Sequence, residues 1–187
     1  MATIAVNHLS FSYPTEDGQN PLTLNDLSAT FPSGGFSLLT GPSGSGKSTL
    51  MKIISGLYPK FSGVITAGEV RLNDTKISDI PESDRGQLVA MMFQNPNQQF
   101  AMDTVERELI FALENQQVAP NHMMARVDRA LDYVEITDLR HRQLNSLSGG
   151  EKQKVALAVI IAMRADTILL DEPFASVDPV ARQLLLS

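Results

Sequence analysis

The sequence has no cysteine and no tryptophan, and no long apolar run. Without cysteine, the chain can form no disulfide, no thiolate metal site and no cysteine nucleophile. The longest apolar run, residues 155–163, has nine residues, whereas a helix needs about 20 to cross a bilayer. The net charge is −6 and lysine and arginine form no block, which argues against non-specific binding to nucleic acid or to anionic lipid. Any membrane association is therefore expected to run through a protein partner.

The length and composition indicate a folded chain. Hydrophobic residues make up 43% of the 187 residues, enough to bury the core of one domain with room for a subdomain. Residues 1–7 carry neither the basic segment nor the long apolar segment of a secretion signal, so no secretion is expected.

A glycine-rich loop at residues 40–49 fits the pattern G-x-x-x-x-G-K-[ST]. We expect a strand over residues 36–39 before it, and the apolar spacing of residues 50, 53, 54 and 57 predicts a helix after it. Backbone N–H groups of such a loop bind phosphate, Lys47 adds a positive charge, and the Ser48 hydroxyl can ligate Mg²⁺. The expected nucleotide-binding residues are Gly41, Pro42, Ser43, Gly44, Ser45, Gly46, Lys47, Ser48 and Thr49. The alternative is a glycine- and serine-rich turn that matches by chance.

Outside the phosphate loop and its helix, apolar patterns up to residue 134 predict strands first and helices after them. Alternating or continuous apolar residues predict strands near residues 9–13, 22–31, 70–72 and 88–93. Helical spacing covers residues 104–114 and 121–134, with Asn121 as the expected N-cap of the second helix. The three histidines, His8, His122 and His141, share no ligand spacing, and we expect them to be surface or packing residues.

Two carboxylates follow the apolar residues 167–170. This pattern predicts a buried parallel strand that delivers Asp171 and Glu172 to the end of a sheet, where ligands bind in open α/β folds. Asp171 is then a Mg²⁺ partner for Ser48, and Glu172 can polarise a water aimed at the γ-phosphate. By itself, the pattern could equally be a strand that ends in solvent.

A second phosphate-binding device is predicted at residues 147–154. Ser148 and Glu151 have the spacing of a capping box that begins a helix. Capping does not require two glycines, whereas Gly149 and Gly150 leave a helix N-terminus bare enough for a phosphate to approach.

With these motifs in this order, the chain resembles the nucleotide-binding domain of an ATP-binding cassette (ABC) protein over essentially its whole length. The resemblance implies a Walker A motif at 41–49, a Q-loop at Gln94, and a Walker B motif at 168–172. It also implies two such domains in a head-to-tail dimer, in which the signature of one closes on the ATP bound by the other. The resemblance assigns the signature to Leu147, Ser148, Gly149, Gly150 and Glu151, and the D-loop to Ser176 and Asp178. It also implies that Tyr13 stacks on adenine; the alternative is a core tyrosine at the end of a strand. In this family Glu172 and Gln94 serve catalysis, and Ser48, Gln94 and Asp171 hold the metal.

A narrower resemblance rests on residues 93–100, Phe-Gln-Asn-Pro-Asn-Gln-Gln-Phe. This run is similar to the Q-loop of the ATPases of energy-coupling-factor (ECF) importers, which take up vitamins or metal ions. It implies ATP hydrolysis coupled to transport and a transmembrane subunit that contacts the region from Gln94 to Met102. It also implies a peripheral location on the cytoplasmic side of the membrane. Alternatively, residues 95–97 are a turn after a strand.

The expected fold is therefore an α/β P-loop NTPase of ABC type, with a mixed sheet core, an antiparallel β subdomain and a helical subdomain. Residues 1–94 and 160–187 would form the core with the β subdomain, and residues 95–159 the helical subdomain. The family's switch histidine should follow the D-loop, and the sequence ends nine residues after Asp178. We therefore expect a C-terminally truncated chain that binds MgATP but hydrolyses it slowly.

Two rival functions start from the same motifs. A P-loop small-molecule kinase would share residues 41–48 but would have no use for the Leu-Ser-Gly-Gly run. An ABC ATPase that acts on DNA or ribosomes is the second alternative. Against it stand the acidic net charge and the absence of coiled-coil heptads between Walker A and the signature.

Overall fold

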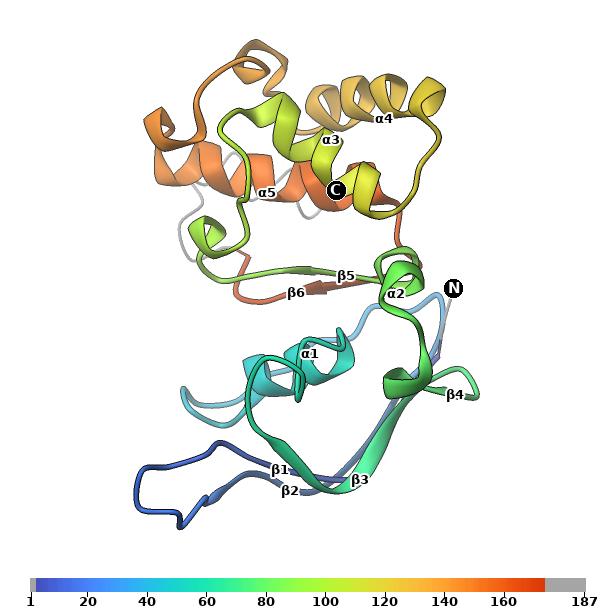
Figure 1. Ribbon diagram of the computed structural model, residues 1–187, viewed down its shortest axis with the longest axis vertical. Coiled ribbons are helices and arrows are strands. Elements are labelled where there is room, and N and C mark those ends of the chain that lie inside the picture. Colours follow the sequence, from blue (N-terminus) through green and yellow to red (C-terminus); the bar gives the residue numbers. More distant parts are fainter. Residues whose placement is uncertain (1–2, 174–187) are drawn as a thin grey trace. The chain divides into compact units, whose positions relative to one another are not determined.

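The computed structural model describes residues 3–173. The chain divides into two compact units, Met1–Val89 and Ala90–Ser187 (Figure 1). The first unit is built on an antiparallel sheet and the second is mainly helical.

The sheet of the first unit has the strand order β2-β1-β3-β4. Its strands are β1 (Ile4–Ser12), β2 (Leu22–Phe31), β3 (Val64–Leu72) and β4 (Thr75–Lys76), and each neighbouring pair is antiparallel. This confirms the predicted antiparallel β segment ahead of the phosphate loop. Ile4 and Val6 alternate along β1, as do Leu9 and Phe11, and an irregularity in the register between Val6 and Leu9 allows all four to be buried.

The helix predicted after the phosphate loop is α1 (Lys47–Ile54). Its apolar face is buried at Leu50, Ile53 and Ile54, as the spacing predicted. The helix ends at Ile54 with Ser55 as its C-cap, and Gly56 follows with a φ of 75°, in the left-handed region that favours glycine. A short 3-10 helix, η1 (Ile77–Asp79), and the helix α2 (Glu82–Leu88) complete this unit.

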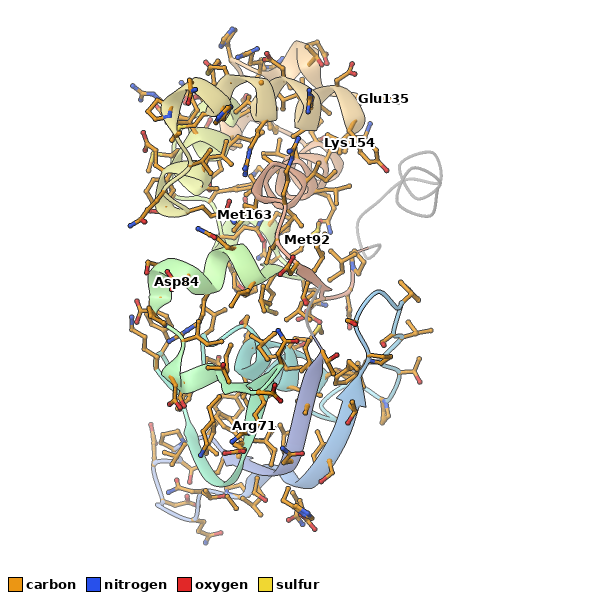
Figure 2. All side chains as sticks on the ribbon, turned by 90° about the vertical axis from the view of Figure 1, so that its right-hand side faces the viewer. Arg71, Asp84, Met92, Glu135, Lys154 and Met163 are labelled. Atoms are coloured by element: carbon orange, nitrogen blue, oxygen red, sulfur yellow. The ribbon has the colours of Figure 1, made fainter. Side chains whose placement is uncertain are left out.

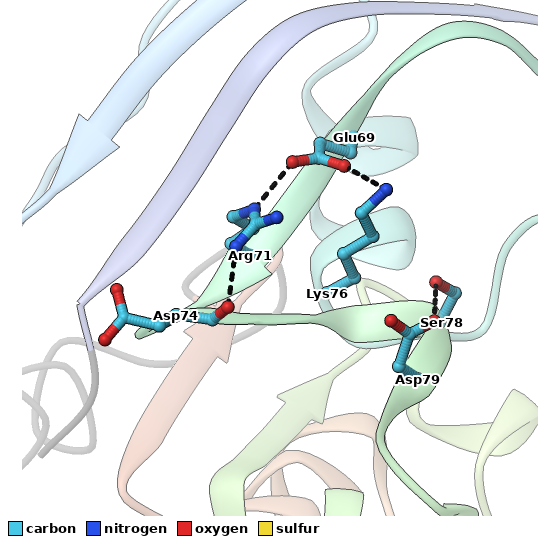
Figure 3. Close-up of polar contacts among 6 residues, drawn as sticks. All are labelled: Glu69, Arg71, Asp74, Lys76, Ser78 and Asp79. Atoms are coloured by element: carbon cyan, nitrogen blue, oxygen red, sulfur yellow. Dashed lines mark hydrogen bonds and ion pairs between the residues drawn. The ribbon is translucent and has the colours of Figure 1, made fainter.

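An ion-pair network fixes β4 against β3 (Figure 3). Glu69 accepts from Arg71 Nε at 2.6 Å and pairs with Lys76 Nζ at 2.6 Å. Arg71 also donates through Nη1 to the backbone oxygen of Asp74 at 2.6 Å. The hydrogen bond from Arg71, followed by that from Lys76, holds the pKa of Glu69 below its usual value.

The second unit packs three helices around one apolar core. They are α3 (Val105–Asn115), α4 (Pro120–Tyr133) and α5 (Gly149–Met163). The 3-10 turns η3 (Thr137–Leu139) and η4 (Leu144–Ser146) lie between α4 and α5. The core includes Leu109 and Leu113 of α3, Val127 and Leu131 of α4, and Val155 of α5, all fully buried. This confirms the two helices predicted near residues 104–114 and 121–134.

The helix α5 lies over a pair of strands, β5 (Val89–Met92) and β6 (Thr167–Leu170) (Figure 1). Ala156 and Ile160 of α5 pack on Met92 of β5 in a second core cluster, and Met163 packs against it (Figure 2). Phe100 contacts both core clusters. It therefore links the helices to the strand pair.

Two local predictions were wrong. Residues 36–39 form no strand, and Phe36 is 89% exposed and Leu38 76% exposed. A strand requires a hydrogen-bonded neighbour, and no strand described in the sheet of the first unit pairs with this segment. Asn121 is not the N-cap of α4, because the helix begins one residue earlier, at Pro120, after Ala119. The fixed φ of proline suits the first position of a helix, so Pro120 sets the start.

Within residues 3–173, none of the helices is long and apolar enough to cross a membrane.

Candidate functional site

The phosphate loop of the first unit is an exposed turn that leads directly into α1. Gly46 is the N-cap residue, and its φ of 89° lies in the left-handed region. A Cβ at this position would lie 2.6 Å from Leu24 Cδ2, so any other residue would displace the Leu24 side chain as well as strain the backbone. As a glycine, Gly46 has no side chain to cap α1. The N–H groups of the first helical turn can therefore donate hydrogen bonds to a phosphate.

Lys47 folds back across this loop. Its ammonium donates to the backbone oxygens of Gly41 and Pro42, each at 2.9 Å. The backbone N–H of Ser45 also donates to Pro42 O at 3.3 Å. The Lys47 ammonium therefore lies against the backbone turn that is predicted to bind phosphate.

Tyr13 lies beside the phosphate loop at the end of β1. Its hydroxyl is 2.9 Å from Thr49 Oγ1 in the first turn of α1. Its ring meets the rings of Phe11 and Tyr58 edge-on, with centroids 5.1 and 5.8 Å away. Burial raises the pKa of the Tyr13 hydroxyl, while the hydrogen bond to Thr49 opposes the rise. The role of the Tyr13 ring was predicted from the sequence, whereas its bond to Thr49 and its aromatic neighbour Tyr58 were not.

The second unit brings together the two residues assigned to catalysis. Gln94 follows β5 and Glu172 follows β6, and Gln94 Nε2 donates to Glu172 Oε2 at 2.6 Å. The pairing continues one residue past the end of β6, because the Asp171 N–H donates to the backbone oxygen of Met92, the last residue of β5, at 3.0 Å. Glu172 has a φ of 48°, in the left-handed region, which is uncommon for a residue with a side chain and typical of functional sites.

The strand that carries these acids is less buried than the sequence predicted. Ile168 in β6 is 47% exposed, and the other residues of the strand are only partly buried. In the part of the chain that the structure describes, β6 pairs with β5 alone, and a strand with one neighbour keeps an open edge. The two acids nevertheless differ, because Asp171 is 4% exposed whereas Glu172 is exposed.

The signature segment forms the predicted capping box at the start of α5. Glu151 N–H donates to Ser148 Oγ at 3.3 Å, and Ser148 N–H donates to Glu151 Oε2 at 2.7 Å. Hydrogen bonding from the Ser148 side chain, followed by that from the Ser148 backbone N–H, holds the pKa of the Glu151 carboxyl below its usual value. At Gly149 an added Cβ would meet no described atom within 4 Å. The surface at this glycine is therefore open to an approaching group.

One residue of this helix has a role that the sequence did not indicate. Gln153 is 2% exposed, and its Nε2 donates to the backbone oxygen of Pro173 at 3.0 Å. Pro173 follows Glu172 directly. Gln153 thus joins the first turns of the signature helix to the segment just after the candidate catalytic carboxylate.

Several assigned residues stay predictions. Ser48 belongs to the first unit, whereas Gln94 and Asp171 belong to the second, so the structure does not test a shared metal site. Their hydroxyl, amide and carboxylate oxygens are the ligand type that Mg²⁺ prefers. Among residues 3–173 no group of three or more histidines or acids could hold a metal alone. The D-loop residues Ser176 and Asp178 lie outside the described residues.

The segment assigned to the membrane partner follows Gln94. It begins with the 3-10 turn η2 (Pro96–Gln98), which Asn95 caps by accepting the N–H of Asn97 at 3.1 Å. The side chain of Phe100 is partly buried against the core, and Met102 is half-buried. Phe100 is therefore in part a core residue, while Ala101 is exposed.

Comparison with known proteins places these features in a family. The family described as ABC transporter matches residues 24–175. The putative HMP/thiamine import ATP-binding protein YkoD of Bacillus subtilis is 42% identical over 94% of the chain, which covers 32% of that protein. The energy-coupling factor transporter ATP-binding protein EcfA1 of Enterococcus faecalis is 40% identical over 96% of the chain. The chain spans 62% of that relative's length.

The fold agrees with the sequence match. The dimeric structure of MJ0796, a bacterial ABC transporter cassette, superposes with a TM-score of 0.86 at 25% sequence identity. The superposition covers 98% of this chain and 79% of the other. The family match spans most of the sequence and includes the phosphate loop, Gln94, the capping box and both acids. The protein belongs to the ABC transporter family.

Proposed function

We propose that this chain is the ATP-binding and ATP-hydrolysing part of an importer of the energy-coupling-factor type. The observation that carries the proposal is the bond between Gln94 and Glu172, which aligns a carboxylate and an amide at the ends of two paired strands. The similarity to EcfA1 over 96% of the chain supports the transport role.

In this proposal the nucleotide binds to the first unit. The N–H groups of residues 41–49 and the ammonium of Lys47 hold the phosphates, and the ring of Tyr13 stacks on adenine. The contact between Tyr13 and Thr49 supports this assignment, because it places the ring beside the loop that would hold the phosphates.

Ser48, Gln94 and Asp171 would hold Mg²⁺. When bound, the ion neutralises charge on the β- and γ-phosphates. Asp171 directly follows β6, and its carboxylate is an oxygen ligand of the type that Mg²⁺ prefers.

Glu172 would act as the general base. Its carboxylate accepts a proton from the attacking water as the water oxygen bonds to the γ-phosphorus. The bond from that phosphorus to the β–γ bridging oxygen breaks, which gives ADP and inorganic phosphate. Gln94 orients the carboxylate through the 2.6 Å bond, and such positioning is the main protein contribution to phosphoryl transfer.

The signature segment would serve the nucleotide of a second ABC domain. Leu147, Ser148, Gly149, Gly150 and Glu151 form the start of α5, and the open surface at Gly149 leaves room for a phosphate. Ser176 and Asp178 would contact the same partner. The dimeric form of the related cassette MJ0796 supports this arrangement.

A transmembrane subunit would contact the region from Gln94 to Met102, which would place the chain peripherally on the cytoplasmic side of the membrane. The imported solute would be a vitamin or a metal ion. The name of YkoD, an HMP/thiamine import protein, favours a vitamin precursor. We further propose the division into a core of residues 1–94 and 160–187 and a helical subdomain of residues 95–159.

The test compares two variants of the full-length protein. Glu172→Gln should bind MgATP as the unmodified protein does but hydrolyse it about 10²–10³-fold more slowly, because the general base is lost. Lys47→Ala should weaken MgATP binding, because its ammonium is lost from the phosphate loop.

Binding is measured by titration with MgATP and turnover by release of inorganic phosphate. Full hydrolysis by Glu172→Gln would assign the base to another residue. Unchanged MgATP affinity in Lys47→Ala would remove the phosphate loop from the proposal.

A further inference from the structure

Glu108 is a buried carboxylate that none of the functional assignments uses. It lies in the first turn of α3 and is 4% exposed. A buried carboxylate is costly unless hydrogen bonds or a positive charge compensate it. The partners of Glu108 therefore show what its burial accomplishes.

Both partners are backbone N–H groups of the segment that precedes the helix. Glu108 Oε2 accepts the N–H of Ala101 at 2.9 Å and that of Met102 at 2.8 Å. A carboxylate near a helix N-terminus is also stabilised by the helix dipole. One oxygen of one side chain thus fixes two consecutive peptide groups.

A second side chain holds the other end of the same segment. Gln99 Oε1 accepts the N–H of Phe93, directly after β5, at 3.2 Å. Between these two points Asn95 caps η2. The backbone of residues 93–102 is therefore fixed at its start by Gln99 and at its end by Glu108, and it carries Gln94 between them.

We propose that Glu108 is a positioning residue for the surface of residues 99–102. Its carboxylate holds the backbone of Ala101 and Met102 in the conformation in which that surface binds a transmembrane helix of the partner subunit. The role in subunit binding rests on the proposed transport function, whereas the hydrogen bonds from Ala101 and Met102 to Glu108 do not depend on it. Because the segment is ordered before the partner arrives, binding loses less conformational entropy.

Three substitutions separate positioning from general stability. Glu108→Gln keeps an oxygen that can accept both N–H groups, Glu108→Ala removes it, and Glu108→Asp shortens its reach by one methylene. Glu114→Ala is the matched control, because Glu114 is an exposed glutamate of the same helix.

The first measurement is amide hydrogen exchange in the full-length protein. The N–H groups of Ala101 and Met102 should exchange roughly tenfold or more faster in Glu108→Ala and Glu108→Asp. They should exchange slowly in Glu108→Gln and Glu114→Ala. Unchanged exchange in Glu108→Ala would overturn the proposal, as would equally accelerated exchange throughout α3 and α4, which would indicate general destabilisation.

The second measurement is binding to the transmembrane coupling subunit in nanodiscs. Glu108→Ala should weaken binding by roughly tenfold, which corresponds to about 1.4 kcal/mol, and Glu108→Gln should restore it. MgATP affinity should be the same in all variants. Equal subunit binding by Glu108→Ala and the unmodified protein would overturn the positioning role. If the unmodified protein does not bind the subunit, the transport function fails and with it this role, while hydrogen exchange still decides whether Glu108 holds the segment.

Discussion

Tyr13 offers a test in which one hydroxyl is separated from one ring. Tyr13→Phe keeps the edge-on contacts with Phe11 and Tyr58 and removes the hydroxyl, and with it the bond to Thr49. Losing one neutral hydrogen bond costs about 1 kcal/mol. For a chain of this length this loss should lower the melting temperature by about 2–4 °C.

Tyr13→Ala removes the two aromatic contacts as well. Each such pair contributes about 1 kcal/mol, so the total loss is about 3 kcal/mol and the melting temperature should fall by about 6–12 °C. The two variants should differ more in nucleotide binding. Stacking of a base on an aromatic ring is worth about 1–3 kcal/mol, so Tyr13→Ala should weaken MgATP binding by about tenfold or more, whereas Tyr13→Phe should leave it nearly unchanged.

Thermal unfolding and titration with a fluorescent ATP analogue measure the two effects. Tyr133→Phe serves as the control, because Tyr133 is 57% exposed on α4. If Tyr13→Phe weakens nucleotide binding as strongly as Tyr13→Ala, the hydroxyl and its bond to Thr49 carry the effect, and the stacking argument is wrong.

Two further predictions concern stability. Leu109→Ala should lower the free energy of unfolding by about 2–5 kcal/mol, since Leu109 is fully buried among three helices. Met124→Ala, at a position that is 43% exposed, should change it by less than about 0.5 kcal/mol in urea unfolding. The lowered pKa of Glu69 should stabilise the fold above its ordinary value of 4.5, and this contribution should be lost as pH falls below that value. Glu69→Gln should therefore flatten the acid side of a stability–pH curve, and an unchanged curve would remove the network of Arg71 and Lys76 from this account.

Local signals predicted most of the fold. The spacing of Leu50, Ile53 and Ile54 predicted one buried helix face without any information about the rest of the chain. These three residues are buried in α1. The capping box at Ser148 and Glu151 was likewise set by residues three positions apart. These elements could be predicted because their hydrogen bonds and burial depend on near neighbours in the chain.

The features that could not be predicted depend on partners that are distant in the sequence or that nearly every residue carries. Residues 36–39 have the composition of a strand, but strand formation depends on a neighbour that the segment itself does not encode. Glu108 carried no local sign of burial, because its partners are backbone N–H groups, which every residue except proline has. Phe100 was predicted only as part of the region from Gln94 to Met102 that contacts a transmembrane subunit, whereas its contacts with two core clusters arise from the path of the whole segment.

Gly149 has a consequence for protein design. Alanine has a higher helix propensity than glycine, and the position where its Cβ would lie is open with respect to the described residues. A redesign guided by folding stability alone would therefore replace this glycine. The same methyl group would occupy the surface proposed to face the partner's nucleotide, so the redesigned chain would become more stable as a monomer while losing its fit to the second ABC domain.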